Sequence, residues 1–289
     1  MPWIPSSMNP SPGMPELPEV ETTRRLLEPI MVGRRVDAVD VDHPRAVRHQ
    51  ANPPDFTTRL LGRRILAMRR QGKYLLIELE GELVWVLHLG MSGRLAARPI
   101  GEARPRHCRV AIGLSSGTVV RLLDSRTFGH TAVFTAEELD ETGIARLGPD
   151  ALLALPRSRV LAAALDGRSA PIKALLLDQR VIAGVGNIYA DEALHRARLS
   201  PHRPGGSLDS ADVARLRRAI TVTLQAGLDA GGTSLDDMAY LLPDGRAGDY
   251  QMRLRAYGRE GERCRRCGGT IRRDVVRGRS SFWCPACQH

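Results

Sequence analysis

The spacing of apolar residues divides the chain into one helix, a run of short strands and then a series of helices. Val20, Leu27 and Met31 recur at helical spacing, and Pro18 suits a first helical turn. Residues 19–31 are therefore predicted to form a helix. Short β-type runs bounded by Gly, Pro and charged clusters follow it, at 35–41, 64–68, 74–79, 83–88, 109–114, 119–123 and 131–134. This pattern predicts an N-terminal β-sandwich with flanking helices.

Helical periodicity replaces the strand pattern near residues 147–149, Leu-Gly-Pro, so a domain boundary is expected within 146–157. The predicted helices cover residues 160–165, 172–177, 188–199 and 211–228. Residues 183–187, Ala-Gly-Val-Gly-Asn, lie between two of these helices. Their glycines permit tight turns and bring backbone N–H groups close to a phosphate, although a plain turn between helices is the simpler interpretation.

Four cysteines near the C-terminus have the number and spacing of zinc ligands. Cys264 and Cys267 form one Cys-x-x-Cys pair, and Cys284 and Cys287 form a second pair after sixteen intervening residues. Two disulfides are the alternative, but a chain without an export signal is expected in a reducing compartment, where thiolates bind metal. We therefore predict one structural Zn²⁺ in a closed site of four cysteines, with the basic and apolar residues between the pairs forming a β-hairpin.

The charge of the chain points to a polyanionic partner. Among 289 residues, 42 are basic and 32 are acidic, which gives a net charge of +10. Neutralised phosphates release condensed counterions, so this excess favours a nucleic acid, with solvated surface charge as the alternative. Only Lys73 and Lys173 among the basic residues are lysines. Because arginine rarely replaces lysine in proton transfer, both are candidates for chemistry.

The remaining sequence features concern the cellular location of the protein and its division into domains. No run of about eighteen apolar residues is present, so no membrane span is expected. Residues 1–13 lack the basic start and apolar centre of a signal peptide, and a cytoplasmic location is expected. The predicted organisation is a disordered or non-native extension at 1–14, a β-sandwich domain at 15–146, a helical domain at 157–250 and a zinc finger at 255–289.

Residues 14–21, Met-Pro-Glu-Leu-Pro-Glu-Val-Glu, read as a translation start placed inside the chain. If Met14 is the initiator and is removed, Pro15 becomes the N-terminal residue. A proline within a chain is a tertiary amide, whereas an N-terminal proline is a secondary amine that can attack an electrophilic carbon. Glu16 beside it could then donate a proton. The alternative for Glu16 and Glu19 is that acidic residues near a helix N-terminus offset the helix dipole.

Five motifs together resemble the formamidopyrimidine-DNA glycosylases of the Fpg/Nei superfamily. They are residues 15–21, Gly-Lys-Tyr at 72–74, His-Leu-Gly-Met-Ser-Gly at 88–93, Gly-Val-Gly-Asn-Ile-Tyr-Ala at 184–190 and the terminal cysteine cluster. The resemblance implies a multidomain α+β fold in which the helical part is a helix-two-turn-helix DNA-binding domain. It also implies a monomeric enzyme of base excision repair that acts on damaged double-stranded DNA.

The resemblance assigns catalytic roles to four residues of a bifunctional DNA glycosylase and abasic-site lyase. Pro15 would form a Schiff base with C1′ of the damaged nucleotide, and Glu16 would donate a proton. Lys73 would contact a phosphate and assist β-elimination, and Arg279 would reach the scissile phosphates and assist δ-elimination. The implied substrates are oxidised purines, namely 8-oxoguanine and formamidopyrimidines.

The resemblance also implies DNA contacts outside the catalytic group. Three residues match a trio that fills the space left by an everted base, and four others match further DNA contacts. Residues 240–250 resemble the loop that closes over an everted 8-oxoguanine. The trio is Met91, Arg126 and Phe128, and the further contacts are His107, Arg168, Lys173 and Asn187.

Two alternative functions remain open from the sequence. One is an endonuclease VIII-like glycosylase for oxidised pyrimidines. The other is a non-catalytic DNA-binding homologue, which would follow if Pro15 is not the mature N-terminus, because an acylated proline nitrogen cannot form a Schiff base.

Overall fold

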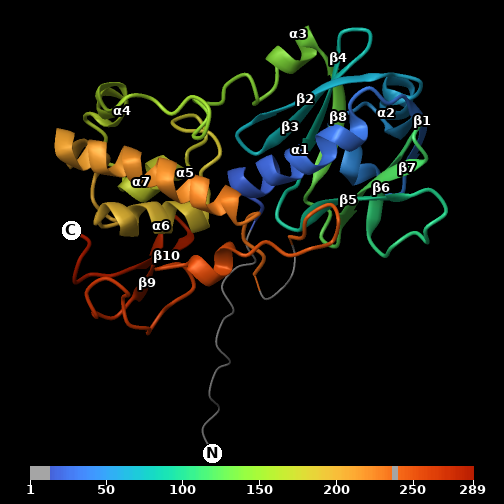
Figure 1. The fold of residues 1–289 in the computed structure, drawn as a ribbon. Helices are drawn as coiled ribbons and strands as arrows, with labels where there is room; N and C mark the ends of the chain where they lie inside the picture. Colours follow the sequence, from blue (N-terminus) through green and yellow to red (C-terminus); the bar gives the residue numbers. More distant parts are fainter. Residues whose placement is uncertain (1–13, 236–239) are drawn as a thin grey trace, which may run out of the picture.

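The computed structural model describes residues 14–235 and 240–289, which form two lobes and a small finger (Figure 1). The first described helix, α1 (Leu17–Met31), packs against the N-terminal lobe on one side and against the helical lobe on the other. It begins at Leu17, two residues before the predicted start at residue 19, and Pro18 lies in its first turn as expected. Helix α1 therefore connects the two lobes.

Two four-stranded antiparallel sheets form the N-terminal lobe, as the strand pattern predicted. Their orders are β1-β6-β7-β5 and β2-β3-β4-β8. The sheets enclose one apolar core that includes Ile77, Trp85, Ile112 and Leu122. The strands are β1 (Val36–Val41), β2 (Ile65–Gln71), β3 (Tyr74–Leu79), β4 (Leu83–His88), β5 (Gly93–Pro99), β6 (Cys108–Leu114), β7 (Thr118–Asp124) and β8 (His130–Thr135).

Several elements of this lobe were missed by the sequence pattern. Strand β5 contains Leu95 as its only large apolar residue, and it forms because it pairs along its whole length with β7. Helix α2 (Pro53–Leu60) buries only two side chains and is too short to show a helical period. The other missed elements are η1 (Pro44–Val47) and α3 (Ala136–Asp140).

Among the described residues, four helices form the second lobe around a core that includes Leu176, Ile188, Leu194 and Leu216. The longest helix begins at a capping box in which Asp209 accepts a hydrogen bond from the backbone N–H of Asp212 (2.7 Å). The helices are α4 (Ser158–Leu165), α5 (Ile172–Leu177), α6 (Asn187–Ala197) and α7 (Ser210–Asp229), with 3-10 turns η2 (Gly205–Ser207) and η3 (Tyr250–Arg253).

The C-terminal finger packs directly under the helical lobe (Figure 1). Its hairpin consists of β9 (Arg272–Val276) and β10 (Arg279–Trp283), as the alternation of basic and apolar residues predicted. Ile271 and Phe282 of the finger belong to the same buried cluster as the helices. The finger therefore shares its core with the helical lobe.

A buried ion network joins the two lobes beside α1. Arg70 on β2 has a fully buried side chain, and its Nε lies 3.0 Å from the carboxylate of Glu21 on α1. The other end of the same guanidinium binds both oxygens of Asp150, at 2.5 and 3.0 Å. Asp150 also accepts the backbone N–H of Gly72 (2.9 Å). One arginine thus joins a strand, a helix and the segment that leads into the helical lobe.

Within the described residues, no helix combines the length and apolar character that crossing a membrane requires.

Replacing Arg70 by Met should destabilise the protein strongly, because the buried Asp150 would lose its guanidinium partner. Glu21 would lose Arg70 as well, but it would keep its ion pairs with Arg24 and Arg25. The expected loss in the free energy of unfolding is about 3–5 kcal/mol. The neighbouring variant R69M is the control, since the Arg69 side chain is 71% exposed and its pair with Glu78 lies at the surface. The R69M variant should lose less than about 1 kcal/mol in the free energy of unfolding. Urea denaturation of both variants measures the difference, and equal losses would refute the proposed importance of the network.

Candidate active site between the two lobes

The side chain of Glu16 reaches from the start of α1 to the start of α6. Glu16 precedes α1, and its backbone N–H donates to the Glu19 carboxylate (2.9 Å). Its own carboxyl group accepts backbone N–H groups from Ile188 (2.8 Å) and Tyr189 (3.4 Å) in the first turn of α6. Free N–H groups at a helix start favour a carboxyl partner. The two lobes therefore meet at this carboxyl group, and Glu16 is 1% exposed.

The glycines that precede α6 allow this close approach. A Cβ atom on Gly186 would lie 2.2 Å from Cδ of Glu16, and one on Gly184 would lie 2.4 Å from Cδ1 of Leu17. Gly184 also has a φ of +107°, which disfavours any other residue. The sequence left two interpretations of these glycines open, a plain turn between helices and backbone exposed to a phosphate. The structure shows that they make room for the start of α1.

Burial shifts the titration of the charged groups around Glu16. Loss of solvent raises the pKa of Glu16 to about 7, although the nearby Lys73 ammonium acts in the opposite direction. Loss of solvent also lowers the pKa of Lys73, which is 6% exposed. A carboxyl group with a pKa near neutrality can act as an acid and then as a base at physiological pH. The pair is thus suited to proton transfer.

Glu19 holds the helix start and the base of a loop in place. Its carboxylate accepts the Tyr189 hydroxyl (2.7 Å) and the backbone N–H of Thr233 (2.7 Å). The hydroxyl of Tyr240 donates to the backbone carbonyl of Glu19 (3.2 Å). Glu19 is 2% exposed, so its partners, rather than the helix dipole alone, explain an acidic residue at this position.

A cavity of about 390 Å³ lies beside Glu16 and is lined by both lobes and the finger. It brings together residues that are far apart in the sequence. Met14 lines the same cavity, so the peptide bond to Pro15 lies next to it. The predicted site residues at its wall are Glu16, Lys73, Met91, Asn187 and Arg279.

The predicted void-filling residues lie on two adjacent loops of the N-terminal lobe. Met91 follows β4, and Arg126 and Phe128 lie between β7 and β8. Arg126 is exposed, and its guanidinium carbon lies 4.6 Å from the centre of the Phe128 ring. His107 lies beside this loop, because its backbone carbonyl accepts the N–H of Asp124 (2.9 Å).

Lys173 lies in a buried environment between the helical lobe and the finger. Its side chain is fully buried, and its ammonium lies 2.7 Å from the Asp191 carboxylate. The same ammonium donates to the backbone carbonyl of Ser280 on β10 (2.7 Å). A phosphate contact by Lys173 would require its ammonium to leave one of these partners, and the contact stays a prediction. Arg168, by contrast, is exposed between α4 and α5, outside the cavity.

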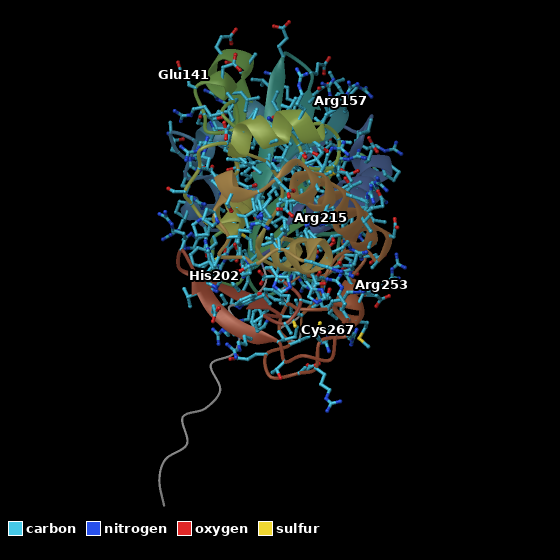
Figure 2. All side chains as sticks on the ribbon, turned by 90° about the vertical axis from the view of Figure 1, so that its left-hand side faces the viewer. Glu141, Arg157, His202, Arg215, Arg253 and Cys267 are labelled. Atoms are coloured by element: carbon cyan, nitrogen blue, oxygen red, sulfur yellow. The ribbon has the colours of Figure 1, made fainter. Side chains whose placement is uncertain are left out.

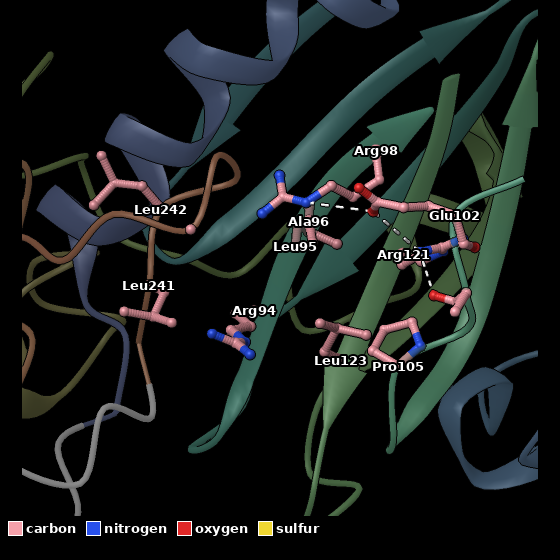
Figure 3. Close-up of a pocket in the computed structure, with 12 residues that line it drawn as sticks. Arg94, Leu95, Ala96, Arg98, Glu102, Pro105, Arg121, Leu123, Leu241 and Leu242 are labelled. Atoms are coloured by element: carbon pink, nitrogen blue, oxygen red, sulfur yellow. Dashed lines mark hydrogen bonds and ion pairs between the residues drawn. The ribbon is translucent and has the colours of Figure 1, made fainter. Parts of the chain in front are cut away.

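A second cavity of about 280 Å³ separates the outer face of β5 from residues 241–245 (Figure 3). Arg98 on β5 donates to the backbone carbonyls of Pro243 (3.0 Å) and Asp244 (3.1 Å). The backbone N–H of Ala97 donates to Pro243 as well (3.2 Å). Residues 240–250 were predicted to form the loop that closes over an everted base. The tip of this loop thus packs against β5, the edge strand of the sheet, away from Glu16.

The four predicted zinc ligands converge in the finger, where Cys267 is labelled in Figure 2. All four sulfur atoms lie within 4.8 Å of one another. The Sγ–Sγ distances are 3.9 Å for Cys264 and Cys287 and 3.5 Å for Cys267 and Cys284. A tetrahedral site with Zn–S bonds of about 2.3 Å requires sulfurs about 3.8 Å apart. The alternative of two disulfides is wrong, because a disulfide requires about 2.05 Å.

Three family models match the chain in succession. They are the formamidopyrimidine-DNA glycosylase N-terminal domain at residues 14–131, the formamidopyrimidine-DNA glycosylase H2TH domain at 147–239, and the zinc finger found in FPG and IleRS at 261–289. The formamidopyrimidine-DNA glycosylase of Mycolicibacterium smegmatis is 44% identical over 281 residues, which cover 95% of this chain and 97% of the relative. The chain belongs to the formamidopyrimidine-DNA glycosylase family.

Solved structures of this family have the same fold. The Thermus thermophilus MutM (Fpg) protein superposes with a TM-score of 0.85 at 43% identity, covering 95% of this chain and 98% of that one. A Lactococcus lactis Fpg mutant in complex with Fapy-dG-containing DNA has a TM-score of 0.87 at 30% identity, with 95% and 100% covered. The wild-type Lactococcus lactis protein was also solved with DNA that contains an oxidised pyrimidine, at a TM-score of 0.86 and 30% identity, with the same coverage.

The family match and the sulfur geometry together assign one structural zinc ion to the cysteine cluster. All four positions of a tetrahedral ion are taken by thiolates, which leaves none for a substrate. The ion would hold the two ends of the finger together around the hairpin. It therefore supports β10, the strand that begins with Arg279.

Replacing Cys284 by Ser should remove the zinc and unfold the finger, because metal binding contributes about 10 kcal/mol or more to such a module. The variant should contain less than one zinc per chain by elemental analysis and should show a lower Tm. Cys108→Ser is the matched control, since Cys108 is buried in β6, away from the cluster. A C284S variant with full zinc content would contradict the assignment.

Proposed function

We propose that this protein is a bifunctional DNA glycosylase and abasic-site lyase of base excision repair, acting in the cytoplasm on damaged double-stranded DNA. The observation that carries the proposal is the buried Glu16, which has a pKa raised to about 7 and lies in one cavity with Lys73, next to Pro15. The named functions of the relatives supply the substrate class, which is oxidised purines in DNA.

The first chemical step would form a bond between the nitrogen of an N-terminal Pro15 and C1′ of the damaged nucleotide. As this bond forms, the glycosidic bond breaks and its electron pair leaves with the base. Glu16, protonated in part at neutral pH, would supply a proton to the sugar ring oxygen or the departing base. Opening of the sugar ring then gives an iminium ion between proline and C1′.

Strand cleavage would follow from the iminium ion by two eliminations. Loss of a proton from C2′ breaks the C3′–O bond and releases the strand that lies 3′ to the lesion. Lys73, with its pKa lowered by burial, is suited to move protons at this stage. A second elimination breaks the C5′–O bond, and Arg279, exposed at the cavity wall, would bind the leaving phosphate.

DNA would lie across the open side of the cavity. Met91, Arg126 and Phe128 would enter the helix where the damaged base has left it, since an enzyme that acts on a stacked base must extrude it. Asn187 at the cavity wall would contact the backbone of the lesion strand, and so would His107, which lies beside the loop of Arg126 and Phe128. Arg168, exposed beyond α4, would contact phosphates at a greater distance from the lesion.

The state of Pro15 decides whether this chemistry can occur. The match to the N-terminal family model begins at Met14, which supports initiation at Met14 followed by removal of the methionine. In a chain that retains residue 14, the Pro15 nitrogen is an amide, and Met14 forms part of the cavity wall. Such a chain would correspond to the alternative of a non-catalytic DNA-binding protein.

Borohydride trapping tests the proposal directly. A protein that begins at Pro15 should form a covalent adduct with a duplex containing 8-oxoguanine opposite cytosine, and peptide mapping should locate the DNA on Pro15. The matched control is the same protein with Met14 retained, which should bind the duplex without being trapped. Equal trapping of both forms, or an adduct on Lys73, would contradict the proposed nucleophile.

The pH dependence of base release tests the role of Glu16. Because the acid must be protonated, the single-turnover rate of 8-oxoguanine release should fall as the pH rises through about 7. The rate should also fall at low pH, where the Pro15 amine becomes protonated and can no longer attack C1′. The E16Q variant should lose base release at every pH. A rate that continues to rise above pH 9 would exclude Glu16 as the proton donor.

A wider substrate range is the second candidate. This candidate rests on the solved complex of the Lactococcus lactis relative with DNA that contains an oxidised pyrimidine. Comparing excision of 8-oxoguanine with excision of an oxidised pyrimidine from matched duplexes distinguishes the two. We expect the purine lesion to be preferred.

A further inference from the structure

The two loops that carry Met91 and Phe128 are packed backbone to backbone. A Cβ atom on Gly90 would lie 2.5 Å from the carbonyl carbon of Phe128 and 2.5 Å from the backbone nitrogen of Gly129. Gly90 also has a φ of +64°, so the turn itself favours glycine. The chain thus brings the β4–β5 loop and the β7–β8 loop as close as two backbones can lie.

Asp124 joins these loops through its side chain. One carboxylate oxygen accepts the Ser92 hydroxyl (2.5 Å) and the backbone N–H of Arg126 (3.0 Å). The other oxygen accepts the backbone N–H of Gly129 (2.6 Å). Ser92 is next to Met91, and Arg126 and Gly129 flank Phe128. A single carboxylate therefore binds both loops at the positions beside their inserted residues.

The surroundings of Asp124 make its hydrogen bonds costly to lose. The residue is 1% exposed, and no cation lies within ion-pair distance of it among the described residues. A buried carboxylate in that situation is stabilised by its hydrogen-bond donors, so losing one of them is costly. Arg48 adds a second support, since it donates to the backbone carbonyls of Phe128 (2.9 Å) and Gly129 (3.2 Å).

A third segment is tied to the same residue through the backbone. The N–H of Asp124 donates to the carbonyl of His107 (2.9 Å), and its carbonyl accepts Nε of Arg109 (2.7 Å). His107 has a φ of +64°, a conformation that is uncommon for residues other than glycine. The segment with the predicted His107 contact thus has a fixed position relative to the void-filling loops.

We propose that Asp124 is a positioning residue that holds Met91, Arg126 and Phe128 as one rigid unit for insertion into DNA. This inference rests on the proposed function and deepens it. Three side chains that enter a base stack together must be ordered on binding, and ordering them beforehand lowers that cost. The Ser92 hydroxyl is the part of this arrangement that couples Met91 to the other two residues.

The S92A variant tests the coupling, because it removes the side-chain donor that the Met91 loop offers to Asp124 and leaves the two backbone donors. Release of 8-oxoguanine from a duplex should fall about tenfold, the value of one hydrogen bond to a charged group. Cleavage of an abasic site in a single-stranded oligonucleotide should change less than twofold, since no void opposite a partner base has to be filled.

Two variants serve as controls. Ser92→Thr keeps the hydroxyl and should restore duplex activity. Ser115→Ala removes a hydroxyl that accepts the Arg35 N–H (3.1 Å) in the turn before β7, and it should leave both activities unchanged. Equal losses of S92A on both substrates, or no loss on the duplex, would overturn the inference. If the unsubstituted Pro15 protein cleaves neither substrate, the proposed function itself has failed, and the inference fails with it.

Discussion

The contact between the Glu16 carboxyl group and the start of α6 is the interaction on which the rest of the structure depends. It joins the lobes at the point where the cavity forms, and it requires Gly186 because no Cβ fits there. The same contact removes Glu16 from solvent, which raises its pKa to about 7. The contact that brings the two lobes together is therefore also the contact that raises the pKa of Glu16 toward neutrality.

Much of the fold follows from local patterns, and the exceptions have identifiable causes. Strands β3 and β4 coincide with the predicted residues 74–79 and 83–88, because their alternating and apolar residues face one core. Strand β5 was missed because small residues and arginines fill it, and its pairing with β7 is not visible in its own sequence. The apolar pattern of a sequence thus predicts strands and helices that have an apolar face of their own, and it misses those that form only by pairing with a neighbour.

The sequence identified residues that meet at one cavity, but it did not reveal all of their contacts. Motifs identified Glu16, Lys73 and Arg279, and the structure places all three at one cavity. The pairing of Lys173 was not predicted, because a lysine near a DNA-binding motif looks the same in sequence whether it faces a phosphate or a buried aspartate. The partner Asp191 lies one helix away, and only the packing of α5 against α6 reveals the pair. The sequence did not indicate a structural role for Asp124, since its hydrogen-bond partners are mainly backbone groups.

The shared core of the finger and the helical lobe has a consequence for synthesis of the protein. Chains emerge from the ribosome N-terminus first, and domains generally fold in that order. Here Tyr257, Ile271 and Phe282 complete a core to which α6 and α7 also contribute. The helical lobe therefore remains open to solvent until the last part of the chain has been made and has bound its metal. Loss of even a short C-terminal segment would expose the apolar faces of these helices. The supply of zinc during translation would then determine what fraction of the chains folds its helical lobe.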